Sequence, residues 1–161
     1  MAQDQDWVLL AYRLPRVPST PRSAIWRKLK RLGVIQLADG LVGLPADART
    51  REQLEWIAED VVDHHGEARL WFGRPADPSG QQALVEQMNL ALAVEYDAVI
   101  AEAAVTCDAD GQTRRRVVAR LRRELHRIEA RDFFATPQRE QARRAVEQLS
   151  GPSKASTATQ R

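Results

Sequence analysis

Several residue types that would indicate a particular class of protein are scarce in this sequence. Cysteine occurs once in the 161 residues, at Cys107, which excludes a disulfide framework and a four-thiolate zinc site. No apolar run approaches the roughly 18–20 residues needed to cross a bilayer, so we expect no membrane association. The first residues are acidic and polar and lack the basic and apolar segments of a signal peptide. We therefore expect a cytoplasmic protein.

What the sequence does contain is a strongly segregated charge. Hydrophobic residues make up 43% and charged residues 29%, which is enough of both for a packed core. The net charge is only +2, but residues 67–111 hold eight acidic and two basic residues, whereas residues 112–132 hold eight arginines and three acids. Residues 21–47 are basic as well. An acidic middle between basic flanks indicates pairing within the molecule, an anionic partner, or both.

The first half of the chain alternates between strand and helix patterns. Asp39-Gly40 is a hairpin signal between two short apolar runs, and Gly33 and Gly66 follow the two helical patterns. The expected elements are a strand at 7–12, a helix at about 20–32, strands at 34–37 and 41–44, a helix at 48–65 and a strand at 68–72. This order predicts an α+β fold, a ferredoxin-like βαββαβ sandwich over residues 1–76.

The second half has only helical periodicity. Apolar positions predict long helices at about 81–105 and 113–132, joined by a tight turn, and a short helix at 138–149. We expect a helical hairpin plus a short helix, residues 77–150, packed on the first domain. Residues 151–161 are rich in Ser, Thr and Ala and are predicted to be a disordered tail.

The clearest candidate for a binding site is a row of arginines on the second long helix. At 100° per residue these side chains share an arc of about 80° and extend over roughly 22 Å. Guanidinium groups at such spacing could follow the phosphates of a nucleic-acid backbone. The alternative is a solvated charged face, or pairing with Glu86, Glu95, Asp97 and Glu102 of the preceding helix. The candidate DNA-binding residues are Arg116, Arg120, Arg123, Arg127 and Arg131.

A second basic cluster lies on the first predicted helix, where no acid occurs between Arg22 and Arg31. Basic residues near a helix C-terminus are also favoured by the helix dipole, so a structural role and a nucleic-acid role both stay open. The candidate residues of this cluster are Arg22, Arg27, Lys28 and Arg31.

No catalytic or metal site is indicated. His64 and His65 are adjacent and point to different sides of a helix, whereas chelation on one helix needs a spacing near four. Cys107 has no neighbouring base. We expect no enzyme activity, no metal and no cofactor. The four tryptophans lie on apolar faces and are expected mainly in the core; they are Trp7, Trp26, Trp56 and Trp71.

An ordered set of short segments marks a resemblance. The segments are Trp7-x-Leu9-x-x-Tyr12-x-Leu14-Pro15, Ser19-x-Pro21-Arg22-x-x-Ile25-Trp26-Arg27-Lys28-Leu29-Lys30-Arg31-Leu32-Gly33, Asp39-Gly40-x-x-x-Leu44-Pro45, Leu54-Glu55-Trp56, Gly66-Glu67-Ala68-x-Leu70-Trp71 and Arg131-Asp132-Phe133-Phe134. Together, over about residues 7–150, they resemble the N-terminal domain of the ChrB family of chromate-resistance regulators.

The resemblance implies a DNA-binding transcriptional regulatory module of the chromate-resistance type. It would contact the DNA phosphate backbone and act as a homodimer, since related ferredoxin-like domains commonly dimerise. Members of the family carry a second, C-terminal domain, so a separate ChrB C-terminal-type sensor domain is a possible partner. The alternative is a protein-interaction module that docks such a sensor domain without binding DNA itself. Nuclease relatives use an acid near the end of the first strand, where this chain has Tyr12-Arg13-Leu14-Pro15.

Overall fold

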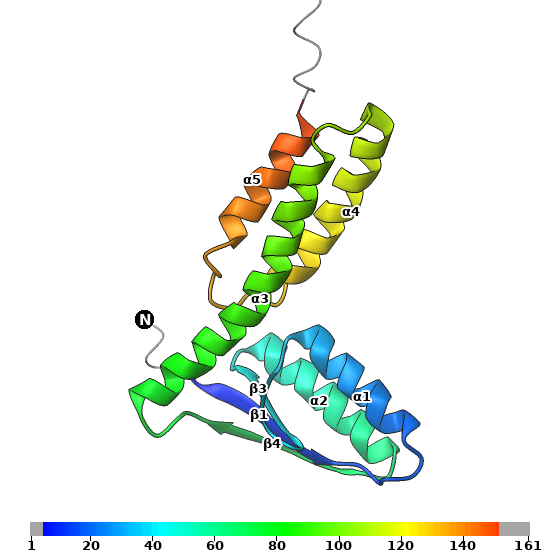
Figure 1. Cartoon of the computed structure of the whole chain (residues 1–161). Coiled ribbons are helices and arrows are strands. Elements are labelled where there is room, and N and C mark those ends of the chain that lie inside the picture. Colours follow the sequence, from blue (N-terminus) through cyan, green and yellow to red (C-terminus); the bar gives the residue numbers. More distant parts are fainter. Residues whose placement is uncertain (1–4, 152–161) are drawn as a thin grey trace, which may run out of the picture. The chain divides into compact units, whose positions relative to one another are not determined.

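The computed structural model of the chain describes residues 5–151 (Figure 1). It contains a four-stranded sheet and five helices, and the chain divides into two compact units, one up to Met88 and the other from Asn89 onward. The elements in chain order are β1 (Trp7–Arg13), α1 (Thr20–Leu32), β2 (Ile35–Ala38), β3 (Leu41–Pro45), α2 (Ala48–Asp63), β4 (Glu67–Gly73), α3 (Pro78–Thr106), α4 (Gly111–Glu129) and α5 (Arg139–Ser150).

The first unit is built around an antiparallel sheet with the strand order β2-β3-β1-β4. Strand β1 is central and pairs with both β3 and β4, while α1 and α2 lie on one face of the sheet (Figure 1). The α+β class and the predicted order of the six elements are confirmed. The ferredoxin-like assignment itself stays a prediction.

Local sequence signals account for the ends of both helices of this unit. Helix α1 has a proline in its first turn and ends at Gly33, whose φ of 77° lies in the left-handed region that glycine adopts without strain. Helix α2 begins with a capping box in which the Asp47 side chain accepts from the Thr50 backbone N–H and the Thr50 hydroxyl accepts from the Asp47 N–H.

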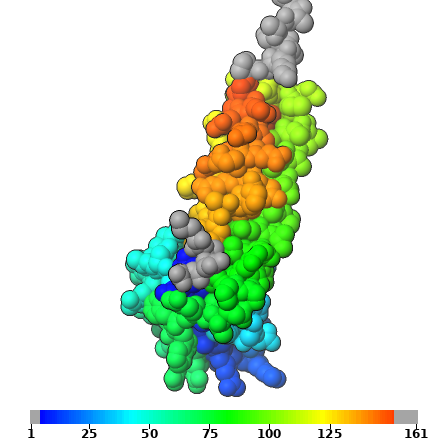
Figure 2. All heavy atoms as spheres, turned by 90° about the vertical axis from the view of Figure 1, so that its left-hand side faces the viewer, coloured from blue at the N-terminus to red at the C-terminus, as the bar shows by residue number. Residues whose placement is uncertain are grey.

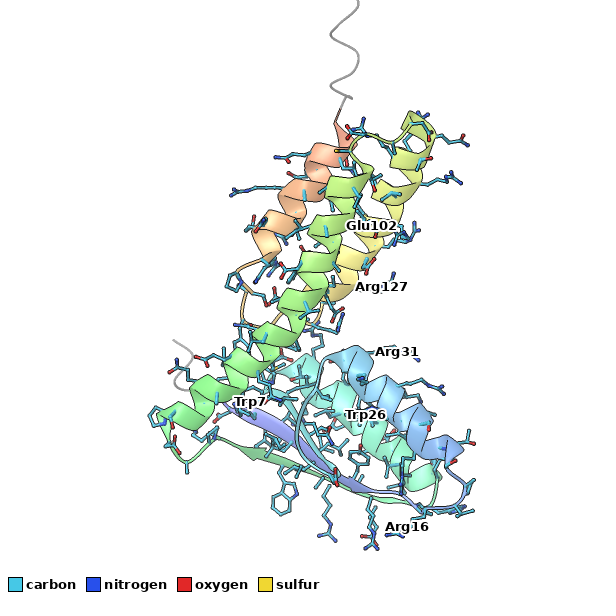
Figure 3. The ribbon with its side chains drawn as sticks, viewed as in Figure 1. Trp7, Arg16, Trp26, Arg31, Glu102 and Arg127 are labelled. Carbon is cyan, nitrogen blue, oxygen red and sulfur yellow. The ribbon has the colours of Figure 1, made fainter. Side chains whose placement is uncertain are left out.

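The first turns of α3 belong with the sheet. Trp7 is 1% exposed, and its indole Nε1 donates a hydrogen bond of 2.8 Å to Oε1 of the buried Gln81 (Trp7 is marked in Figure 3). Burial of a large aromatic ring and its one polar group ties the start of α3 to β1. The division between the compact units falls within α3, after Met88. The predicted domain boundary after residue 76 stays a prediction.

The second unit is formed by three helices that share one apolar core. Helix α5 contributes to it along with α3 and α4, so the C-terminal half is a three-helix unit (Figure 1). The fully or nearly buried members are Leu92, Tyr96, Val99, Ala103, Val118, Leu121, Leu125, Ile128, Ala142, Val146 and Leu149. Of the predicted disordered tail, all but Gly151 lies outside the described residues.

A buried polar cluster explains why α4 is shorter than predicted. The helix ends at Glu129 instead of continuing to Asp132. The Asp132 carboxylate accepts hydrogen bonds from the Thr136 backbone N–H, the Thr136 hydroxyl and the hydroxyl of the buried Tyr96. Because the Asp132 carboxylate accepts hydrogen bonds from these buried donors, the helix can end and the chain can turn here without leaving them unpaired.

The expectation that the tryptophans lie mainly in the core is wrong for two of the four. Trp56 is 66% and Trp71 is 57% exposed, while Trp26 is half-buried. Trp56 lies away from the buried face of α2, and Trp71 lies on β4, which is an edge strand. Within residues 5–151 no helix has the length and apolar character needed to cross a membrane.

Candidate nucleic-acid interface

Helix α4 is held so that one side is fixed in the core and the opposite side faces outward. Its core residues recur every three or four positions, from Val118 to Ile128. Its N-terminus is capped by Asp110, whose carboxylate accepts from the backbone N–H groups of Gln112 and Thr113. Hydrogen bonds from Thr113, from its side chain first, lower the pKa of Asp110, so this cap stays charged at neutral pH.

The five arginines predicted on α4 divide into two groups. Arg116, Arg123 and Arg127 are exposed and form no ion pair with any carboxylate of residues 5–151. Figure 3 marks Arg127 on this helix. Arg120 and Arg131, by contrast, bind carboxylates of α3. Their partners are Glu102 for Arg120 and Glu95 for Arg131.

The five arginines of the predicted row are therefore not all unpaired. Arg131 is only 20% exposed and donates to both oxygens of Glu95, over 3.0 and 2.7 Å. Arg120 also lies 3.9 Å from Glu124, one turn along the same helix. The alternative interpretation, pairing with the acidic preceding helix, holds for these two arginines, and three outward-facing cations remain.

Two further exposed arginines of α4, Arg115 and Arg122, were not among the predicted site residues. They lie on the side of the helix away from Arg120, and Arg122 donates to the Ser150 hydroxyl over 3.0 Å. Both lie outside the 80° arc of the predicted row, because each is about 100° around the helix from the arginine that follows it, Arg116 or Arg123. The run Arg114-Arg115-Arg116 was the signal available, but Arg114 is buried and donates to the carbonyls of Leu149 and Gly151.

The basic cluster on α1 does not form one surface. Arg27 and Arg31 are exposed and form no ion pair within the described part of the chain (Arg31 is marked in Figure 3). Lys28 lies toward α2, where it binds the Asp60 carboxylate. Arg22 lines a groove in the first unit and donates a long hydrogen bond of 3.4 Å to the Leu14 carbonyl. The four residues therefore point to three different environments.

Two strong perturbations of pKa lie in the second unit. Burial, helped by the hydrogen bond to Asp132, raises the pKa of Tyr96 well above its ordinary value of 10.0. The hydrogen bond to Glu129 raises the pKa of Arg143 further, so this guanidinium stays charged. Both groups tie segments of the second unit together. Within residues 5–151 no three His, Cys, Asp or Glu side chains are grouped in a way that could hold a metal ion.

Comparison with known proteins gives one curated relative and one family. Protein ChrB of Cupriavidus metallidurans is 30% identical over 132 residues, which cover 80% of this chain and 40% of the relative. The chain thus spans about two fifths of that relative's length. No solved structure matches the chain. The family model described as Protein ChrB, N-terminal, matches residues 22–155, which include α4 and all of α1 but its first two residues. The chain therefore belongs to the family of ChrB N-terminal domains.

Proposed function

We propose that this chain is a DNA-binding regulatory module of the chromate-resistance type, which acts in the cytoplasm as a dimer and has no catalytic role of its own. The observation that carries the proposal is the outward face of α4. Three exposed arginines on it, Arg116, Arg123 and Arg127, form no ion pair with a carboxylate within the described residues. Membership of the ChrB N-terminal family supports the regulatory part of the proposal.

The geometry of this face suits the phosphate backbone of DNA. From Arg116 to Arg127 the helix rises roughly 17 Å. Each guanidinium can donate two hydrogen bonds to one phosphate, and each contact releases condensed counterions from the DNA. Arg115 and Arg122 flank the row and widen the cationic surface. Such contacts give affinity and orientation, while base contacts would have to come from other residues.

A second surface supports the dimer. On α3 between Leu90 and Val105 an exposed row of side chains carries no charge, although the opposite side of the same helix is already in the core. Leu90, Val94 and Val105 are 69%, 70% and 80% exposed. Figure 2 shows part of α3, in green, as an uncovered ridge beside α5, in orange. The full row is Leu90, Ala91, Val94, Ala98, Ala101 and Val105, which we call the α3 stripe.

A row of exposed apolar side chains on one side of a helix whose other side is already in the core is typical of a contact surface. The α3 stripe spans an arc of about 100°, and its alanines would allow a second helix to approach closely. A second copy of the chain carries the same stripe on its own α3. If the two stripes pack against each other, each copy covers the stripe of the other, as in a two-fold interface. We therefore assign the dimer contact to this stripe.

The alternative function is a protein-interaction module that docks a separate sensor domain of the ChrB C-terminal type and does not itself bind DNA. The α3 stripe is the observation that favours it, since an uncharged helix face fits a protein partner as well as a second copy. In this alternative the separate domain, and not this chain, would sense the oxyanion. The ferredoxin-like arrangement of the first unit also stays part of it, supported by the order of strands and helices.

Retardation of promoter DNA by the purified chain, measured over a salt series, tests the proposed function. We expect binding at low salt and a steep, linear fall of the logarithm of the association constant with the logarithm of the salt concentration. The protein-interaction alternative predicts no retardation at any salt concentration. Repeating the series with chromate then tests whether this chain responds to the oxyanion.

A further inference from the structure

The first unit contains a groove of about 900 Å³ at the end of the sheet where β1 ends. Its walls come from the end of β1 and the loop after it, the first turns of α1, the turn between β2 and β3, and the loop between α2 and β4. Figure 3 marks two lining residues, Arg16 and Trp26. The lining also includes Tyr12, Arg13, Arg22, Asp39 and Glu67.

Two glycines hold these walls against the strand end. A Cβ at Gly40 would lie 2.4 Å from the Tyr12 carbonyl oxygen, and a Cβ at Gly66 would lie 2.5 Å from that of Arg13. Gly40 also has a φ of 73° and accepts a backbone hydrogen bond of 2.7 Å from the Tyr12 N–H. Because only glycine permits such close approach, the two turns are pinned to the end of β1 and the groove is largely pre-formed.

The groove contains more positive charge than its own residues neutralise. Arg13 and Arg16 are exposed, and their side chains form no ion pair or hydrogen bond within the described part of the chain. Arg22 uses its guanidinium only for the long bond to the Leu14 carbonyl. Nearby, α1 begins without a side-chain cap and without an acidic residue in its first turn, so its dipole adds to the positive potential.

Aromatic rings and carboxylates line the same groove. Trp26 is half-buried, and Lys30 Nζ lies 5.8 Å from the centre of its ring, which helps to hold the indole in place. Burial raises the pKa of Tyr12, more than Arg22 lowers it, so its hydroxyl stays a neutral donor at physiological pH. Asp39 and Glu67 add acceptors for hydroxyl or amino groups of a ligand.

From this combination we propose that the groove binds a nucleoside phosphate. The guanidinium groups of Arg16 and Arg22 would hold the phosphate, Trp26 and Tyr12 would contact the planar base, and the carboxylates would accept hydrogen bonds from the ribose or the base. This site lies wholly within the first unit and is independent of the arginines of α4. It therefore goes beyond the proposed DNA binding.

A small inorganic oxyanion fits the size and lining of the groove less well than a nucleotide does. The volume of about 900 Å³ is near the upper end of the range of roughly 300–1,000 Å³ that is usual for sites of drug-sized ligands. The lining also contains two carboxylates, Asp39 and Glu67. They would repel a small anion, which has no uncharged part to place beside them. A ligand with an anionic end and a neutral, donor-bearing planar end fits both parts of the lining.

Isothermal titration of the whole chain with ADP, GDP and CDP tests the proposal, with inorganic phosphate as the reference ligand. We expect saturable binding of at least one nucleotide, and an affinity for phosphate lower by about tenfold or more, because phosphate lacks the base contacts. Arg16→Ser and Arg22→Ser should each weaken nucleotide binding by about tenfold or more, since each removes charged hydrogen bonds. Trp26→Leu should weaken the nucleotide and leave phosphate unchanged.

The matched control is Arg27→Ser, which removes an exposed arginine of the same helix that does not line the groove. It should bind nucleotide as the unchanged chain does, and so should the variant lacking Arg116, Arg123 and Arg127. Absence of heat with all three nucleotides would overturn the proposal, as would equal binding of phosphate or equal losses in Arg27→Ser. Displacement of the nucleotide by promoter DNA would instead make the groove part of the DNA surface and would also overturn it.

Discussion

Arg131, two residues after the end of α4, binds Glu95 of α3 through two parallel hydrogen bonds, from Nη1 to Oε1 over 3.0 Å and from Nη2 to Oε2 over 2.7 Å. Two donors on a planar guanidinium match the two oxygens of a carboxylate, which gives this pair a defined geometry. The basic and acidic segments of the sequence thus serve in part to fasten one helix to the other. Only the arginines that point away from α3 are left for an external partner.

Loss of the Arg131–Glu95 pair should destabilise the second unit. Arg131→Met keeps the apolar stem and removes the charged hydrogen bonds, and we expect the free energy of unfolding to fall by about 1 kcal/mol, since the pair is only partly exposed. Arg123→Met is the control, because Arg123 has no carboxylate partner among residues 5–151, and it should change stability by less than about 0.5 kcal/mol. Denaturant unfolding measures both, and equal values would contradict the assignment.

Tyr96 should make the protein less stable at alkaline pH. Its pKa is raised in the folded state, so the folded chain keeps the phenolic proton at a pH at which the unfolded chain, with an ordinary pKa of 10.0, releases it. Above that pH the unfolded state binds fewer protons, and stability falls as the pH rises. Below it, this group contributes no pH dependence.

Tyr96→Phe provides the measurement. The variant should be less stable at neutral pH by about 1–2 kcal/mol, because the buried Asp132 carboxylate loses the hydroxyl that donates to it. Its stability should then decline less steeply above pH 10 than that of the unchanged chain. Denaturant unfolding at a series of pH values measures the slope, and identical slopes would show that Tyr96 does not titrate as argued.

The sequence predicted the helices and strands better than it predicted which of their side chains are paired or exposed. Helical spacing placed Arg120 and Arg123 in one arc, but only packing decides that Arg120 lies beside Glu102 while Arg123 faces outward. The periodicity of one helix identifies its buried side. It does not show on which side of that helix the neighbouring helix packs. Similarly, the apolar pattern around Trp71 predicted a strand correctly, yet its exposure depends on which face of the sheet is covered. Trp71 pairs with Leu9, whereas the neighbouring Leu70, on the other face, pairs with the buried Leu10.

The groove of the first unit could not be predicted from the sequence, because it too depends on how distant segments pack together. Arg13, Arg22, Asp39 and His65 lie on four separate segments, and no motif joins them. Glycine at position 40 was expected as part of a hairpin turn. That it also presses against the Tyr12 carbonyl, and so forms one wall of the groove, depends on tertiary structure.

Removal of the three outward arginines should abolish most of the DNA affinity. The triple variant Arg116→Ser, Arg123→Ser and Arg127→Ser deletes up to three phosphate contacts per chain, so the magnitude of the salt slope should fall by up to about 2.7 per chain. None of the three arginines is in the core or in an ion pair within residues 5–151, so the fold should be retained. Fluorescence anisotropy with promoter DNA over a salt series measures both affinity and slope.

A control of equal charge separates this effect from the general loss of positive charge. Arg51, Arg74 and Arg144 are exposed arginines outside α4, and their combined change to Ser alters the net charge by the same amount. The control should keep the salt slope, because these residues lie on other surfaces. If it weakened binding as much as the α4 variant, the contact surface would not be the one assigned here.

A charge placed in the α3 stripe should dissociate the proposed dimer. Val94 is 70% exposed in the single chain, so Val94→Glu should leave each chain folded. In a two-fold interface, however, it would bury two unpaired carboxylates, which should weaken association by about a hundredfold or more. Val62→Glu makes the same exchange at another exposed valine, on α2, and should leave the dimer intact. Sedimentation velocity over a concentration series distinguishes the cases: a dimer that survives Val94→Glu, or dissociates equally with Val62→Glu, would place the contact elsewhere.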